Sequence, residues 1–113
     1  MNYTGKAQFS LIFTAPPELE SEGDRLFSLH AAWMEETHHR EGEKALLQYN
    51  VAKNSDDDGN IRFVLTEVYE TMAGVDDHYK QAGSWEWIDD WQKFGDQCKA
   101  TYVGGASIIH SLW

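Results

Sequence analysis

His78 is the strongest candidate in this sequence for a chemical role. It borders the apolar face of a short helix predicted over residues 72–82. Because small environmental shifts move a histidine pKa across neutrality, His78 could act as a general base or orient a substrate. The alternative is a hydrogen-bonded histidine packed between a helix and a sheet.

His30 and Trp33 lie three residues apart in a longer predicted helix, so they occupy neighbouring positions on its surface. If both helices cover one face of a sheet, these two residues would line the same cavity as His78. A tryptophan at such a position is also ordinary core, and a histidine on an apolar stripe commonly has a local partner. His30 and Trp33 are therefore expected to bind substrate or else to belong to the core.

Asn50, Glu67 and Tyr69 are polar or ionisable residues in two runs typical of paired strands. Side chains alternate between strand faces, so Glu67 and Tyr69 share a face of one strand, and Asn50 shares a face of the other with Gln48. A buried amide, carboxylate or phenol must find a hydrogen-bond partner. We interpret Asn50 and Tyr69 as catalytic candidates beside His78, and Glu67 as a substrate-binding one; the alternative is that all three stabilise a dimer.

Two local patterns imitate metal sites. Glu35-x-x-His38 and Glu36-x-x-His39 have the spacing of di-iron bundles, but no matching carboxylate pair completes them, so a solvated helix end is the preferred interpretation. The acidic loop of residues 54–65 resembles a calcium loop but ends in leucine instead of glutamate and is flanked by strand patterns. The sequence therefore predicts no metal site.

Composition narrows the class of protein. The 113 residues predict a single domain over residues 1–113, and the net charge of −10 with nine scattered basic residues argues against nucleic acid and membrane as partners. The one cysteine, Cys98, lies on an apolar helical stripe and is expected to be inert, without an intrachain disulfide. No signal-peptide layout or membrane-length apolar run is present, so a cytoplasmic location is predicted.

The elements that must position these residues follow from turn and cap signals. Residues 7–14 form an apolar run rich in strand formers, which two prolines end. Ser21 with Asp24 three residues later resembles a capping box. A helix is predicted from there to about residue 40, with Gly42 as its stop.

The second half continues with a hairpin, two helices and a strand. The runs 45–54 and 61–70 flank an Asp-Gly loop, which predicts the hairpin. Thr71 is expected to cap the short helix that carries His78, and Ser84 to cap another helix with a wide apolar stripe. Residues 100–113 predict a last strand, bulged at two adjacent glycines. The order β-α-β-β-α-(α)-β is the pattern of ferredoxin-like domains, an α+β fold with an antiparallel sheet.

The two hairpin strands carry apolar residues on both faces, which indicates a sheet covered on both sides. The chain's own helices can cover one face. We expect a second copy of the chain to cover the other, as in a homodimer.

The run FVLTEVYETMAGVDDHY, residues 63–79, resembles the antibiotic-biosynthesis-monooxygenase-like (ABM) members of the dimeric α/β-barrel superfamily. In that family the third strand ends in an aromatic-rich stretch with a glutamate, and the next helix carries a small residue and then a histidine. The matching residues here are Glu67, Tyr69, Ala73 and His78. The segment EGEKALLQYNVAK resembles the family's first helix end and second strand, and with element order the likeness spans roughly residues 7–110.

The resemblance implies a dimeric α/β barrel with a pocket between each sheet and its helices. It implies cofactor-free oxygenation of a small aromatic or quinone-like substrate in some relatives, haem breakdown in others and isomerisation in a few. In haem-degrading relatives a histidine matching His78 holds iron, helped by a first-strand asparagine and a third-strand tryptophan. Here the first strand has no asparagine and Tyr69 stands in the region of the tryptophan, so no haem and no other cofactor is predicted.

Two functions stay open. One is a small cofactor-independent, monooxygenase-like enzyme acting on an aromatic or quinone-like molecule, and the other is a non-catalytic dimer that binds a small ligand or regulates a partner. A cavity of a few hundred cubic ångströms would favour catalysis if His78 and either Asn50 or Tyr69 project into it. Solid packing around these side chains would favour the second function.

Overall fold

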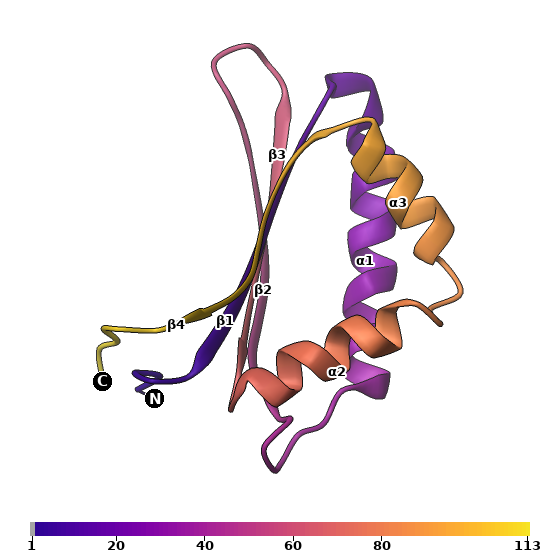
Figure 1. Cartoon of the computed structure of the whole chain (residues 1–113). Helices are drawn as coiled ribbons and strands as arrows, with labels where there is room; N and C mark the ends of the chain where they lie inside the picture. Colours follow the sequence, from indigo (N-terminus) through magenta and orange to yellow (C-terminus); the bar gives the residue numbers. More distant parts are fainter. Residues whose placement is uncertain (1) are drawn as a thin grey trace.

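Four antiparallel strands form one sheet in the order β2-β3-β1-β4, with three α-helices packed against it (Figure 1). The structure is a computed structural model that describes residues 2–113. The strands are β1 (Ala7–Ala15), β2 (Leu46–Ser55), β3 (Ile61–Tyr69) and β4 (Lys99–Ser107). The helices are α1 (Glu20–Thr37), α2 (Met72–Ala82) and α3 (Ile88–Asp96), with a short 3-10 helix η1 (Pro17–Leu19) before α1. This α+β architecture is compatible with the predicted ferredoxin-like fold.

All three helices cover the same face of the sheet (Figure 1). On the two central strands every second residue is buried beneath them, from Ala7 to Ala15 in β1 and from Ile61 to Tyr69 in β3. Phe13 and Phe63 lie at the middle of this core, where Phe27 of α1 stacks on Phe63 at a centroid distance of 5.1 Å. Gly23 of α1 allows this close packing, because a Cβ there would lie 2.4 Å from the Phe63 ring.

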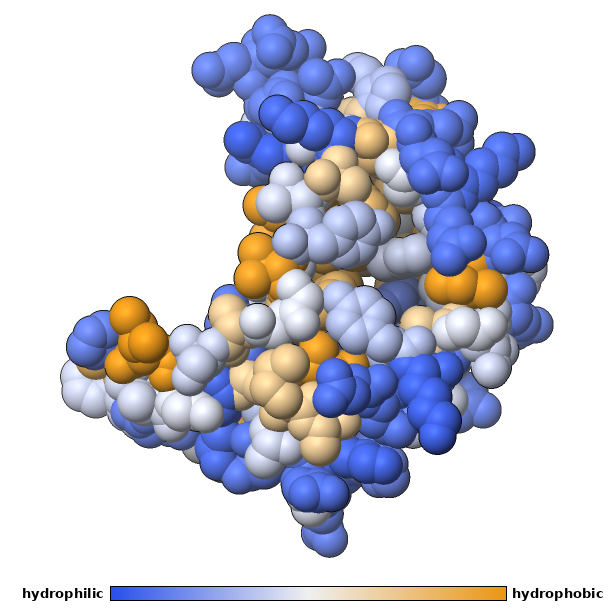
Figure 2. Space-filling model, in the orientation of Figure 1, coloured by the Kyte–Doolittle hydropathy of each residue, from blue (hydrophilic) through white to orange (hydrophobic). Residues whose placement is uncertain are grey.

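No helix within residues 2–113 covers the opposite face of the sheet (Figure 1). Its side chains mix hydroxyl and aliphatic groups, with Ser10, Ile12, Val64 and Thr66 half-buried on the two central strands. Figure 2 shows apolar surface on this side and on the C-terminal arm. On that arm the side chains of Ile109, Leu112 and Trp113 are 76 %, 74 % and 91 % exposed. We call the sheet surface on this side the open face.

The boundaries predicted for α1 were wrong at both ends. The helix begins at Glu20, directly after η1, and no side chain caps it, so the proposed capping box does not form. It ends at Thr37 instead of near residue 40. Thr37 Oγ1 donates a hydrogen bond to the carbonyl oxygen of Trp33 at 2.7 Å, and His38 adopts an extended backbone. Threonine hydroxyls compete in this way with the backbone hydrogen bonds of a helix.

Of the caps predicted for the other two helices, one is present and one is absent. Thr71 caps α2 as predicted, and its hydroxyl accepts a hydrogen bond from the backbone N–H of Ala73. Ser84 does not cap α3, because the chain makes further turns before α3 begins at Ile88. Those turns place Trp85 in the core, where it is 6 % exposed.

The bulge predicted in the last strand is present. The register between β1 and β4 shifts at Gln8/Phe9, and Gly105 has a φ of +123°, a conformation that residues with a side chain rarely adopt. The strand ends at Ser107, so the predicted strand was too long, and residues 108–113 run beside the N-terminal segment instead. There Gly5 donates a backbone hydrogen bond to Ile108.

Among residues 2–113, none of the helices has the length and apolar character that crossing a membrane requires.

Candidate functional site

A cavity of about 290 Å³ lies between the sheet and the helices. Strand residues form its floor, and residues of α1, α2, α3 and the loop before α3 form its walls. Six of the fourteen lining residues are aromatic, and the two lining imidazoles are those of His30 and His78. The aromatic residues are Phe9, Trp33, Tyr79, Trp85, Trp91 and Tyr102. We call this space the inner cavity.

His78 lies on the buried side of α2, where it is 5 % exposed. Its Nδ1 atom lies 2.9 Å from Nε2 of His38 and 3.7 Å from Oε1 of Glu67. Burial, with a further contribution from His38, lowers the pKa of His78 to about 4. The imidazole is therefore neutral at physiological pH and able to accept a proton.

Glu67 points from β3 toward the helices and is completely buried. Its Oε1 accepts a hydrogen bond from the Tyr69 hydroxyl at 2.5 Å. Its Oε2 has no hydrogen-bond partner within residues 2–113. Burial raises the pKa of Glu67 to about 7, although the hydrogen bond from Tyr69 opposes the shift. A buried carboxyl with one unpaired oxygen is costly in a purely structural role and is typical of functional sites.

His30 lies on α1 and is also buried. Its ring stacks on Trp91 at a centroid distance of 4.6 Å, and its Nδ1 lies 2.8 Å from the hydroxyl oxygen of Tyr49. Burial, followed by the proximity of His78 and His38, lowers the pKa of His30 to about 3. His30 is thus a second neutral imidazole, with one nitrogen paired to a strand residue.

The hydrogen bonds around His38 assign the tautomers of two histidines. Thr37 Oγ1 donates to the Trp33 carbonyl, so it can only accept from Nδ1 of His38, which lies 3.0 Å away. A neutral His38 then has its lone pair on Nε2 and accepts the N–H of His78 Nδ1. The consequence is that Nε2 of His78 keeps a free lone pair.

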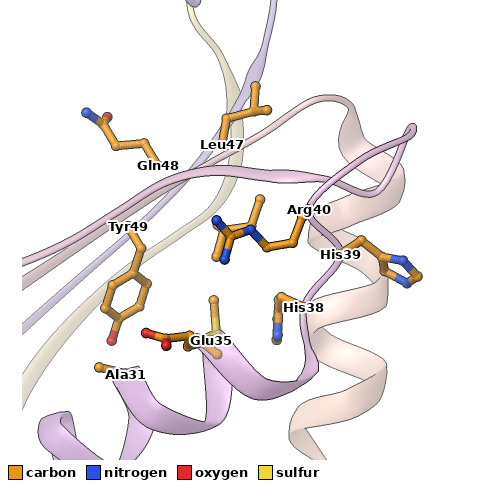
Figure 3. Close-up of a pocket in the computed structure, with 10 residues that line it drawn as sticks. Ala31, Glu35, His38, His39, Arg40, Leu47, Gln48 and Tyr49 are labelled. Carbon is orange, nitrogen blue, oxygen red and sulfur yellow. The ribbon is translucent and has the colours of Figure 1, made fainter.

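A second cavity, of about 320 Å³, lies between the C-terminal end of α1 and β2 (Figure 3). His38 and Tyr49 line this outer cavity, together with Glu35 and Arg40 (Figure 3). His38 bonds to His78 and Tyr49 bonds to His30, and both partners line the inner cavity. Two hydrogen-bonded pairs therefore join the inner cavity to the outer one.

The structure brings together most of the residues singled out from the sequence. Trp33 lines the inner cavity between the two histidines, 5.5 Å from the His30 ring and 5.6 Å from the His78 ring. Neither Tyr69 nor Glu67 lines it; Glu67 lies behind His78 and accepts the hydrogen bond of the Tyr69 hydroxyl. Asn50 lies apart, since it is exposed and pairs with Thr66 on the open face.

Two polar members of the cluster, His38 and Tyr49, were missed by sequence reasoning. The interpretation of His38 as part of a solvated helix end was wrong. The helix ends at Thr37, and the side chain of His38 turns inward, where it is 7 % exposed. Tyr49 is directly opposite Glu67 in the hairpin. Knowledge of the hairpin register would have placed it on the inner face with Glu67.

The same cluster contains a set of atoms with the spacing of metal ligands. One nitrogen each of His30 and His78 and one oxygen of Glu67 lie within 4.8 Å of one another. Searching for short motifs could not find this set, because its members come from α1, β3 and α2.

Comparisons with family models, with curated proteins and with solved structures find no match to this chain. The ABM resemblance therefore stays a prediction, and function must be argued from the site itself.

Proposed function

We propose that this chain is a small monooxygenase-like enzyme that acts on an aromatic or quinone-like molecule held in the inner cavity, with side chains alone performing the proton transfers. The observation that carries the proposal is the His78–Glu67 pair at an aromatic-lined cavity. A neutral imidazole with a free nitrogen lines that cavity, and a buried carboxyl lies 3.7 Å behind it.

The cavity suits a small, flat ring system. Its volume of about 290 Å³ is at the lower end of the range of ligand sites. The rings of Trp33 and Trp85 stack on each other at 5.3 Å, and Trp91 meets Trp85 edge-on at 5.6 Å. Such walls offer faces and edges to an aromatic guest. The two imidazoles, the Gln92 amide and the hydroxyls of Tyr79 and Tyr102 are polar groups that can recognise its hydroxyl or carbonyl oxygens.

The first chemical step is removal of a proton from the substrate by Nε2 of His78. The imidazolium that forms lies near the Glu67 carboxylate, which stabilises its charge. The Tyr69 hydroxyl holds that carboxylate in place. Nδ1 of His78 keeps its proton in the hydrogen bond to Nε2 of His38, a residue that lines the outer cavity.

The second step joins the substrate anion to molecular oxygen. A carbanion at a ring CH₂ or C–H adds to O₂ to form a peroxide anion, which takes a proton from the His78 imidazolium. Loss of water from the hydroperoxide then leaves a carbonyl group. For a CH₂ carbon the sum is R₂CH₂ + O₂ → R₂C=O + H₂O, in which the four electrons lost by carbon reduce one O₂.

The proposal includes a homodimer in which the open faces of two sheets meet as a barrel. Three observations support it. The open face has half-buried aliphatic residues, Ile12 and Val64, at its centre, and no helix covers it within residues 2–113. The C-terminal arm extends three large exposed apolar side chains beyond the sheet. A domain this small also gains stability from pairing.

The competing function is a non-catalytic, small-molecule-binding protein of the same fold. It is favoured by one observation, namely that neither Asn50 nor Tyr69 lines the inner cavity. The polar groups there would then serve only for recognition.

The deciding experiment measures binding and turnover separately. Protein treated with EDTA is incubated with a panel of hydroquinones, naphthols and anthrones, and ligand binding is followed by quenching of Trp fluorescence. Oxygen uptake is recorded in parallel, with ¹⁸O₂ used to trace one oxygen atom into the product. We expect turnover that His78→Gln lowers by about 10²-fold or more and that His110→Gln, an exposed control, leaves unchanged. Binding without oxygen uptake by any compound would overturn catalysis and favour the binding protein.

A further inference from the structure

The unpaired Oε2 atom of Glu67 is a feature of this site that the proposed reaction does not use. This oxygen is completely buried and has no hydrogen-bond donor within the described residues. A buried carboxylate normally has a cation or several donors around it. None of its four neighbouring side chains, those of His30, Tyr49, Tyr69 and His78, is a permanent cation. The site is short of positive charge.

We propose that His30, Glu67 and His78 bind one divalent first-row transition-metal ion, such as Zn²⁺, at the wall of the inner cavity. Two imidazoles and one carboxylate are a ligand set that such ions prefer over Mg²⁺ or Ca²⁺. One donor atom of each residue already lies within 4.8 Å of the other two. Tetrahedral coordination requires donor separations of about 3.4 Å, so the three donors have to move closer together to bind an ion.

The surrounding hydrogen bonds prepare both imidazoles for this role. Histidine ligands usually pair their second ring nitrogen with another group, which fixes the ring and its tautomer. Here Nδ1 of His30 pairs with Tyr49, and Nδ1 of His78 pairs with His38. The Nε2 atoms are then the nitrogens left without a hydrogen-bond partner. Because Nδ1 is the His78 nitrogen that lies 3.7 Å from Oε1 of Glu67, an ion bound through Nε2 requires the His78 ring to turn.

Three protein ligands leave at least one coordination position for water or a ligand, as in catalytic metal sites. His30 and His78 line the inner cavity, so that position would face it. The ion and a proton compete for the same lone pair of His78. Metal binding is therefore expected to block the proton transfer proposed above instead of assisting it.

The test is a titration of the tag-free, EDTA-treated protein, without any substrate. Zn²⁺ is followed by calorimetry and Co²⁺ by its visible absorption bands. We expect one ion per chain with a dissociation constant of about 10 µM or tighter. His78→Gln and Glu67→Gln are expected to weaken binding at least about tenfold. His39→Gln, which changes an exposed histidine outside the triad, is the matched control and should bind as the unchanged protein does.

A measurement on the unaltered protein covers the case in which a variant fails to fold. Co²⁺ is paramagnetic, so it should broaden the ring NMR signals of His30 and His78 far more than those of His110. The proposal is overturned if no saturable one-to-one binding occurs at about 100 µM ion, or if the histidines broaden equally. Absence of metal binding leaves the proposed oxygenation standing, and absence of oxygen uptake leaves the metal site standing, so the two failures are distinguishable.

Discussion

Nε2 of His38 and Nδ1 of His78 lie 2.9 Å apart, and this hydrogen bond joins the end of α1 to the middle of α2. It is buried, and the orientation of the Thr37 hydroxyl determines which nitrogen carries the proton. The pair therefore controls two properties of His78: the tautomer that it adopts and the ease with which it accepts a second proton.

Replacing His38 should change the titration of His78. Proximity to His38 contributes to the low pKa of His78, which is about 4. In His38→Gln that contribution is absent, so the pKa of His78 is expected to rise toward its ordinary value of 6.5. Titration of the ring resonances by NMR measures the shift. His39→Gln should leave the pKa of His78 as it is, and an equal shift in both variants would contradict the direct role of His38.

Glu67 should make the protein less stable as the pH rises. Its pKa is raised from 4.5 to about 7 in the folded state, so the folded state binds the proton more tightly. The stability that this proton contributes is complete below pH 4.5 and is lost as the pH rises through 7. Glu67→Gln should therefore gain stability relative to the unchanged protein between about pH 5 and pH 8, by on the order of 3 kcal/mol.

Urea unfolding in EDTA at several pH values measures this difference. Glu36→Gln, at an exposed position of α1, is the control and should give a constant difference. The prediction requires that the difference in unfolding free energy between the Glu67 variant and the unchanged protein changes with pH. A difference that is the same at every pH would reflect only packing and would contradict it.

His30 and His78 should act in the opposite direction. Their pKa values are lowered from 6.5 to about 3 and about 4, so the unfolded state takes up protons first as the pH falls below 6.5. The stability contributed by the two neutral rings is present above pH 6.5 and is lost on acidification through about 4 for His78 and about 3 for His30. His78→Gln should reduce the acid sensitivity seen in the same unfolding experiments. If the unfolding free energy of this variant falls with acidification as steeply as that of the unchanged protein, His78 is not buried in its neutral form.

Gly74 should not tolerate a side chain. A Cβ at this position of α2 would lie 2.5 Å from the Tyr69 ring and 3.0 Å from the backbone oxygen of Lys44. Gly74→Ala should therefore cost about 1–3 kcal/mol of unfolding free energy and displace Tyr69 from Glu67. Gly83→Ala is the matched control, since its Cβ would meet nothing closer than 3.9 Å. Thermal unfolding compares the two, and equal melting temperatures would rule out the tight packing around Tyr69.

Charge placed on the open face should separate the proposed dimer. Val64 lies on central strand β3, so Val64→Glu would bring two carboxylates toward each other in a face-to-face pair. Light scattering after size exclusion should give the mass of a dimer for the unchanged chain and of a monomer for this variant. Ala32→Glu introduces the same charge on an exposed position of α1 and should stay dimeric. A monomeric unchanged chain would remove the barrel from the proposal.

Much of the framework could be predicted because its signals are local. The prolines after β1, the Asp-Gly loop of the hairpin and the Thr71 cap each act within a few residues. A bulge can be predicted from glycines in the sequence without knowledge of the paired strand, and the bulge in β4 lies at Gly105. His78 could be singled out for a similar reason, because the helical repeat already placed it at the edge of the buried face of α2.

The rest of the site depends on contacts between distant segments. Tyr49 reaches His30 because the hairpin register turns it inward, and the same register turns Asn50 outward. His38 was missed because a helix end depends on competition between Thr37 and the backbone, which helical periodicity does not describe. The set of His30, Glu67 and His78 exists only after two helices have packed on one strand.

The early end of α1 links the length of a helix to acid–base chemistry. The chain leaves helical geometry at His38, whose backbone is extended, and there Nδ1 of His38 pairs with the Thr37 hydroxyl while Nε2 pairs with His78. The reactivity of the imidazole on α2 thus rests on a hydroxyl group in a different helix, which makes Thr37 a control point that touches neither the cavity nor anything bound in it.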